Sequence, residues 1–180
     1  HSIVQSGDGN YVVGGFWQSD TYDFWLLKFD TDGNTIFEET YGGSWTDIAQ
    51  DMQETSDGGY ILVGETNSYG NGNDDVYLIK TDLNGIEQWS QTFGGSDFDK
   101  GYAIVQDVDN GFIIGGSSRS YGDGSEDGWI IKVDSEGNVE WDETHGGPTQ
   151  DVFRSVSITS DNGYIISGYS DSDAWLVRYE

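Results

Sequence analysis

The chain has 180 residues, of which 33 are Asp or Glu and seven are Lys or Arg, so its formal net charge is −26. Surfaces that bind nucleic acids or anionic lipids need positive charge, and this composition argues against both. Cys is absent and His occurs twice, which excludes thiolate chemistry and leaves little material for zinc sites or His-dependent triads. No apolar run approaches the ~18 residues that cross a bilayer, so no membrane insertion is expected.

Three sequence patterns recur along the chain, the first with a spacing of 52 residues. A Gly pair followed by Asp gives GGSWTD, GGSDFD and GGPTQD, with the acids at Asp47, Asp99 and Asp151. A turn pattern reads DGNY, DGGY, DNGF and DNGY. An apolar segment, FWLLKFD in its first copy, carries one basic residue, which is Lys28, Lys80, Lys132 and Arg178 in turn. The patterns divide a single domain, 1–180, into units of approximately 1–41, 42–93, 94–145 and 146–180.

Each unit is predicted to form four short strands. In the second unit we expect strands at Ala49–Thr55, Tyr60–Glu65, Val76–Thr81 and Ile86–Phe93. The turns between the outer strand pairs contain Gly or Asn, which supply the positive φ of a tight hairpin. No segment has a helical period with caps.

A repeat of about 50 residues with four antiparallel strands is typical of a β-propeller blade. The sequence therefore predicts an all-β propeller with about four blades, the last of which lacks its fourth strand. In this arrangement the loop between the second and third strands shares a face with the GGSxxD link, and both hairpin turns lie on the opposite face.

The repeat GGSxxD, DGGYI and WLIKxDxxGxxxW resembles that of secreted and cell-surface β-propeller proteins of bacteria and archaea, a family mostly without assigned function. The resemblance covers the whole chain. The apolar run with a Gly pair at Val12–Gly15, followed by Tyr22 and Trp25, is similar to kelch repeats. The segment from Asp82 to Trp89 is similar to the tryptophan-docking motif of quinoprotein propellers, although it is one residue shorter between Asp and Gly. These similarities imply the fold and carry over no quinone binding.

The repeat boundaries predict fifteen strands. Propellers usually close by completing one blade with strands from both ends of the chain, because an open edge invites aggregation. No surplus strand is predicted here. We therefore expect a fragment of a larger ring or assembly, with self-association through the incomplete blade as an alternative.

The basic column, Lys28, Lys80, Lys132 and Arg178, has two interpretations. It could form a ring of cations for an anionic ligand, or each stem could pack between blades with its charge against Asp47, Asp99 or Asp151. Recurrence in every unit favours the structural role. The same acids could be metal ligands, but capping of the N–H groups in their own Gly-Gly loops is favoured.

Two acidic, Gly-rich loops suggest calcium as an alternative to a solvated acidic surface. Hard oxygen ligands on compliant backbone suit Ca²⁺, and a bound cation would offset part of the net charge. The candidate ligands are Asp74, Asp75, Asp123 and Asp127. The turn from Asp30 to Asn34 resembles the start of a calcium loop but lacks the required ligand spacing.

Several aromatic residues fall in or beside the loops of one face, where they could stack on a ligand: Trp17, Trp45, Tyr69, Phe98 and Tyr121. No carboxylate pair stands out from the repeat, and His145 occupies an aromatic packing position, so no catalytic residue is expected. The sequence thus predicts a non-catalytic extracellular or cell-surface module that binds a protein or glycan. Two alternatives are a carbohydrate-binding propeller and, more distantly, part of a polysaccharide-acting enzyme.

Overall fold

The computed structural model describes residues 2–18 and 20–179, and within them the protein is all-β with no helix. Fifteen strands are found in these residues. They are β1 (Ser2–Gln5), β2 (Tyr11–Gln18), β3 (Tyr22–Phe29), β4 (Thr35–Tyr41), β5 (Asp47–Glu54), β6 (Tyr60–Thr66), β7 (Asp75–Thr81), β8 (Glu87–Phe93), β9 (Asp99–Gln106), β10 (Phe112–Ser118), β11 (Asp127–Val133), β12 (Val139–His145), β13 (Asp151–Ile158), β14 (Tyr164–Ser170) and β15 (Asp173–Tyr179). No membrane-spanning helix exists in this described part of the chain.

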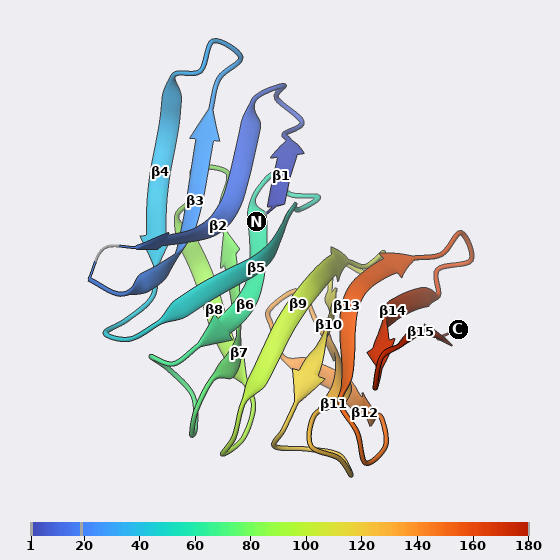
Figure 1. Ribbon diagram of the computed structural model, residues 1–180. Coiled ribbons are helices and arrows are strands. Elements are labelled where there is room, and N and C mark those ends of the chain that lie inside the picture. Colours follow the sequence, from blue (N-terminus) through green and yellow to red (C-terminus); the bar gives the residue numbers. More distant parts are fainter. Residues whose placement is uncertain (1, 19, 180) are drawn as a thin grey trace.

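The strands form four antiparallel sheets, each built from consecutive strands. In the described part of the chain, three sheets have four strands and the last consists of β13, β14 and β15, with β15 at its edge. The sheets follow one another along an arc, with β1–β4 and β13–β15 at its two ends (Figure 1). The first strand of each sheet contacts the first strand of the next. The predicted all-β architecture of antiparallel sheets with three or four strands is therefore present.

The hairpin turns follow from local chemistry. In the β3–β4, β7–β8 and β11–β12 turns, the Gly N–H donates to the carbonyl of the Asp three residues earlier. These glycines, Gly33, Gly85 and Gly137, have φ of 86°, 79° and 83°, which an L-residue adopts only with strain. The Asp side chains accept further backbone N–H bonds within the same turns. The calcium-like segment Asp30–Asn34 is thus a hydrogen-bonded turn.

The core lies between the sheets. Val12, Phe24 and Leu26 of the first sheet form one cluster with Leu62 and Ile79 of the second. The opposite face of the second sheet packs on the third, and the third packs on the fourth in the same way. Inner sheets are therefore covered on both faces, which explains why β6, β7, β10 and β11 are buried at every position.

Candidate functional site

The recurring acids of the GGSxxD links close the loops at one end of the sheets. Asp47, Asp99 and Asp151 are buried, and each accepts a hydrogen bond of 2.8–2.9 Å from the second Gly N–H of its own link. Asp99 also accepts bonds from the hydroxyls of Ser118 and Ser120, and Asp47 accepts equivalent bonds from Thr66 and Ser68. The expected capping bonds are present, and both oxygens of Asp47 and of Asp99 already accept hydrogen bonds from the chain.

The basic column lies at the other end of the sheets. Lys28, Lys80 and Lys132 have side chains exposed by only 4–6%. Their carboxylate partners are those of the preceding turns: Asp8 at 2.7 Å, Asp57 at 3.0 Å, and both Asp107 at 2.7 Å and Asp109 at 2.9 Å. Arg178 pairs with Asp161 in the same way but is 44% exposed.

This arrangement corrects one expectation from the sequence, because Asp47, Asp99 and Asp151 are not the partners of the basic column. The acid of each DGGY-type turn lies beside the basic residue of the third strand, since the turn joins the first two strands at the end of the sheet where the third strand also ends. The link acids lie where the third strand begins.

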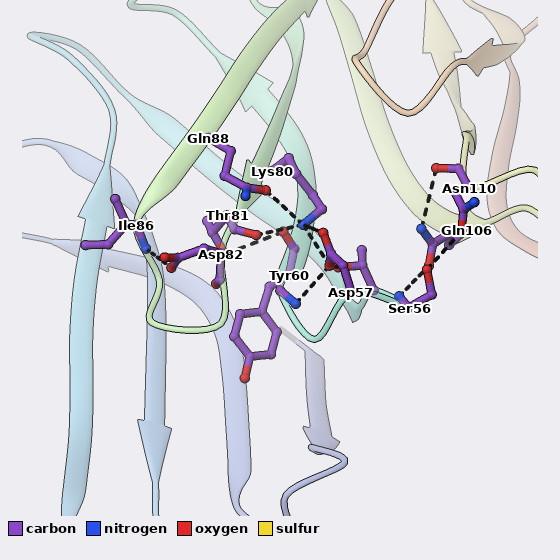
Figure 2. Close-up of polar contacts among 12 residues, drawn as sticks. Ser56, Asp57, Tyr60, Lys80, Thr81, Asp82, Ile86, Gln88, Gln106 and Asn110 are labelled. Atoms are coloured by element: carbon purple, nitrogen blue, oxygen red, sulfur yellow. Dashed lines mark hydrogen bonds and ion pairs between the residues drawn. The ribbon is translucent and has the colours of Figure 1, made fainter.

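The environment of Lys80 shows that its charge is used within the fold (Figure 2). Its ammonium donates to the carboxylate of Asp57, to the carbonyl of Thr81 at 2.7 Å and to the side chain of Gln88 at 3.2 Å. An ammonium has three hydrogens, so no donor remains for an external anion. Burial alone would raise the pKa of Asp57, but bonds from Thr55, Gly59 and Lys80 lower it to about 2.

The same turn is tied to the third sheet. The backbone N–H of Ser56 donates to Gln106 at 2.7 Å, and its hydroxyl donates to Asn110 at 2.9 Å (Figure 2). A hollow of about 310 Å³ lies beside these bonds, lined in part by Asp57, Lys80 and Phe112. Because its polar groups bond one another, this region joins two sheets and offers few free groups to a ligand.

The predicted aromatic residues are distributed along the sheets and do not form one platform. Tyr69 and Tyr121 occupy equivalent places: each hydroxyl donates to the carbonyl of a link Gly, and each ring lies against an aromatic residue of the following strand, Tyr77 or Trp129. Each lines its own shallow hollow. Trp17 packs near Trp25, with 53% of its surface exposed, and Trp45 is 64% exposed.

The predicted calcium ligands lie in two separate loops, Asp74 and Asp123, and at the start of the strands that follow them, Asp75 and Asp127. Asp75 and Asp127 are buried, and each accepts a backbone N–H bond from its own loop, from Asn71 at 2.7 Å and Gly124 at 2.9 Å. Asp74 accepts a bond from Asn67, and Asp123 is exposed. Among residues 2–18 and 20–179 no group of three or more acids and histidines has the arrangement of a metal site.

A different cluster is the better candidate for binding. A hollow of about 240 Å³ at the loop end of the second and third sheets is lined by Asp74, Phe98, Lys100, Arg119 and Glu126, and we call it the Lys100 pocket. The ring of Phe98, 37% exposed, lies 5.6 Å from the Arg119 guanidinium carbon. Lys100 extends from β9, and the other four residues lie in the loops beside β7, β9 and β10–β11.

The charges of the Lys100 pocket are balanced. Lys100 pairs with Glu65 at 3.0 Å and lies 3.6 Å from Asp74, while Arg119 pairs with Glu126 at 3.2 Å. Burial alone would lower the pKa of Lys100, but the Glu65 carboxylate raises it. Burial would raise the pKa of Glu126, but bonds from Ser117, Gln150 and Arg119 lower it. The pocket thus presents both signs of charge beside one aromatic ring, a combination suited to a polar ligand without large net charge.

Of this pocket, the sequence had indicated Phe98 and Asp74 and missed Lys100, Arg119 and Glu126. One feature of the sequence could have indicated the two basic residues of the pocket. Three of the seven basic residues lie outside the repeating column, and they are Lys100, Arg119 and Arg154. The residues 52 positions away from Lys100 are Ile48 and Val152, so Lys100 departs from the repeat. Arg154 lies on the neighbouring strand β13, with its guanidinium carbon 3.8 Å from the centre of the Tyr102 ring.

Comparison with known proteins shows similarity in structure alone. No family model and no curated protein matches the chain. A crystal structure of a protein of unknown function from Bacteroides caccae is similar, with a TM-score of 0.59 and 7% sequence identity over 92% of this chain. The match covers 51% of that protein, so this chain spans about half of its length. At this identity the likeness supports the all-β fold and no function.

Proposed function

We propose that the chain is part of a β-propeller that acts as a non-catalytic binding module outside the cell or at its surface. Four sheets of consecutive antiparallel strands, arranged along an arc, support the blade assignment. The sequence resemblance to secreted and cell-surface propellers and the net charge of −26 support the location. The Lys100 pocket is the proposed binding site.

One observation carries this proposal. The basic residues that do not belong to the repeating column gather at the loop end of β9–β11 and on β13, and two of them line a pocket together with a half-exposed aromatic ring. Residues that hold a blade together recur in every unit, as Lys28, Lys80 and Lys132 do. Charged residues that occur once and converge in space are better explained by a ligand.

A carbohydrate is the second, more specific proposal for the ligand. Sugars present many hydroxyls, which charged side chains can bind, and an apolar ring face, which can stack on an aromatic side chain. The Lys100 pocket is lined by the Phe98 ring together with charged side chains that include Arg119 and Asp74. Tyr69 and Tyr121, each 45% exposed, would be additional contacts on the loops of successive sheets.

Catalysis is less well supported by the same pocket. A glycosidase of the common type needs a carboxylic acid whose pKa is raised so that it can donate a proton. The pKa of Glu126 is instead lowered, and its carboxylate accepts bonds from Ser117 and Gln150, each at 2.7 Å. Glu126 is therefore suited to hold Arg119 in place.

The test is binding of the whole chain to an array of neutral and acidic oligosaccharides, followed by titration calorimetry with each positive glycan. Phe98→Ala and Arg119→Met should each weaken binding by at least about tenfold, which corresponds to ~1.4 kcal/mol. Leu83→Ala, at an exposed position of the β7–β8 turn, is the control and should bind normally. If glycans bind and binding is abolished only by Tyr69→Ala and Tyr121→Ala, the binding site lies on the loops that carry these two tyrosines and not in the Lys100 pocket. Hydrolysis of a polysaccharide would overturn the non-catalytic assignment.

A further inference from the structure

The first sheet has an apolar outer face that no other sheet covers within residues 2–18 and 20–179. Because side chains alternate along a strand, Val12, Phe24 and Leu26 face the second sheet, while their neighbours face away from it. The outward set, which we call the leading face, is half-buried or exposed and consists of Ile3, Tyr11, Val13, Trp25, Leu27 and Phe29. Within this face the rings of Tyr11 and Phe29 stack with centroids 5.6 Å apart.

In the second and third sheets the equivalent residues are buried against the preceding sheet. The same register pairs Ile3 with Val13 in the first sheet, Met52 with Leu62 in the second and Ile104 with Ile114 in the third. Met52 and Leu62 are 2% and 0% exposed, whereas Ile3 is 64% exposed. The leading face is therefore one half of an interface that the protein forms three times internally.

The other half of such an interface is present on the last sheet. Its outer, trailing face comprises Ile165, Ser167, Ala174, Leu176 and Arg178. In the first sheet the corresponding positions are Val12, Gly14, Phe24, Leu26 and Lys28, which pack on the second sheet. Leu176 is 61% exposed although Leu26 is 0% exposed. One chain thus carries both complementary halves, each without a partner sheet among the described residues.

We propose that the leading face binds the trailing face of a second copy of this chain, so that copies associate head to tail. The β13–β15 sheet of one copy would stack on the β1–β4 sheet of the next, as sheets stack within the chain. Such an interface joins two different surfaces and generates a ring or a filament. It is distinct from pairing through the edge strand β15, because its contacts are between side chains on sheet faces.

The internal interfaces supply the geometry. A Cβ built on Gly14 lies 2.6 Å from the Cβ of Met52, and one built on Gly115 lies 3.9 Å from the Cβ of Val156. Ser167 occupies the position of Gly14 and Gly115 in its sheet, and Ile3 occupies the position of Met52 and Val156. In the proposed interface, Ser167 of one copy would therefore lie against Ile3 of the next. The ammonium of Lys28 lies 5.8 Å from the centre of the Tyr60 ring on the next sheet. Arg178 corresponds to Lys28 and Tyr11 corresponds to Tyr60, so Arg178 of one copy should face Tyr11 of the next.

The interface between copies should be weaker than the internal ones. Phe37 of β4 and Trp89 of β8 contribute rings against Tyr60 and Phe112 of the next sheets. The last sheet, as far as it is described, consists of three strands and presents no equivalent ring from a fourth strand. The net charge of each copy also opposes association. We therefore expect a concentration-dependent equilibrium that is favoured by salt, because screening reduces the repulsion.

Sedimentation equilibrium of the whole chain in about 0.3 M NaCl, from micromolar concentrations to about 1 mM, tests the proposal. Leu27→Arg on the leading face and Leu176→Arg on the trailing face should each give monomers. An equimolar mixture of the two variants should form dimers, because each retains the face that the other lacks. Leu83→Arg, in an exposed turn outside both faces, should associate like the wild type.

Cross-linking gives a second measurement that does not depend on disrupting a face. The chain has no Cys. Ile3→Cys and Ser167→Cys proteins, mixed under mild oxidation, should form a disulfide-linked heterodimer, since the equivalent Cβ separation between Gly115 and Val156, 3.9 Å, lies within the range that a disulfide spans. Neither variant should cross-link to itself. Self-linking of Ile3→Cys would indicate that two leading faces pair instead, and a monomeric wild type that does not cross-link would also overturn the proposal.

Discussion

The carboxylates of Asp75 and Asp99 approach the same glycine from two successive sheets. A Cβ built on Gly94 would lie 1.9 Å from Asp75 Oδ1 and 2.7 Å from Asp99 Oδ2. Both acids are buried. The same relation joins Asp127 to Asp151 around Gly146, so each link brings two acids together at a point where only Gly leaves enough room.

Replacing Asp75 with Asn should stabilise the protein at neutral pH. Burial raises the pKa of Asp75 to about 6, and the charges of Asp99 and Asp74 add to this effect, although the Asn71 N–H opposes it. A raised pKa means that the native state favours the protonated acid. The resulting stabilisation is present below pH 4 and is lost as the pH rises through 6.

Asn keeps an oxygen that can accept the Asn71 bond and carries no charge. Urea denaturation should therefore show Asp75→Asn to be more stable than the wild type at pH 7 by about 1–3 kcal/mol, with the difference shrinking toward pH 4. Asp123→Asn, in the exposed loop, is the control and should lack this pH-dependent gain. A loss of stability in Asp75→Asn at pH 7 would contradict the prediction.

Adjacent glycines of the third link should respond differently to the same substitution. In Gly146→Ala the new methyl group would lie 2.3 Å from Asp127 Oδ1 and 2.6 Å from Asp151 Oδ2. We expect a loss of about 1–3 kcal/mol from this overpacking. A Cβ on Gly147 meets no atom within 4 Å, so Gly147→Ala should change the free energy of unfolding by less than about 0.5 kcal/mol. Equal effects in thermal denaturation would contradict this explanation.

The strands were predictable because the local patterns are strong. In the second unit the observed strands, β5 to β8, begin and end within two residues of the expected ones. Gly in the hairpin turns and apolar runs in the middle strands specify these boundaries without long-range information. The fifteen predicted strands are found for the same reason.

The pairing of side chains between strands was less predictable. Asp57 and Lys80 are 23 residues apart, and only the position of the turn relative to the third strand selects Asp57 as a partner. Lys100, which lines the Lys100 pocket, lies 35 residues along the chain from Glu65, its ion-pair partner on the neighbouring sheet. Repetition draws attention to residues shared by the units, whereas the two basic residues of this pocket, Lys100 and Arg119, lie outside the repeating basic column.

Lys132→Met should destabilise the protein strongly because it leaves acids unpaired. Asp107, whose side chain is 5% exposed, and Asp109 both bond the Lys132 ammonium. Removing one partner of a buried ion pair typically costs about 3–5 kcal/mol. Arg178→Met is the matched control from the same column, since Arg178 and Asp161 are 44% and 59% exposed and solvent screens their interaction. Chemical denaturation should show a much smaller loss for this control, and comparable losses would be contrary to the proposed role of burial.

Calcium should stabilise the protein no more than sodium does at equal ionic strength. A Ca²⁺ site needs six to eight oxygens at about 2.3–2.6 Å. Asp75 and Asp127 begin different strands, β7 and β11, and already accept backbone bonds from Asn71 and Gly124. With a net charge of −26, however, either salt should raise the melting temperature by screening repulsion.

Scanning calorimetry in CaCl₂ and NaCl measures both effects, with EDTA-treated protein as the reference. A larger shift in calcium, lost in the Asp74→Asn, Asp75→Asn double variant, would instead establish a specific site, because an ion bound to the native state stabilises it by mass action.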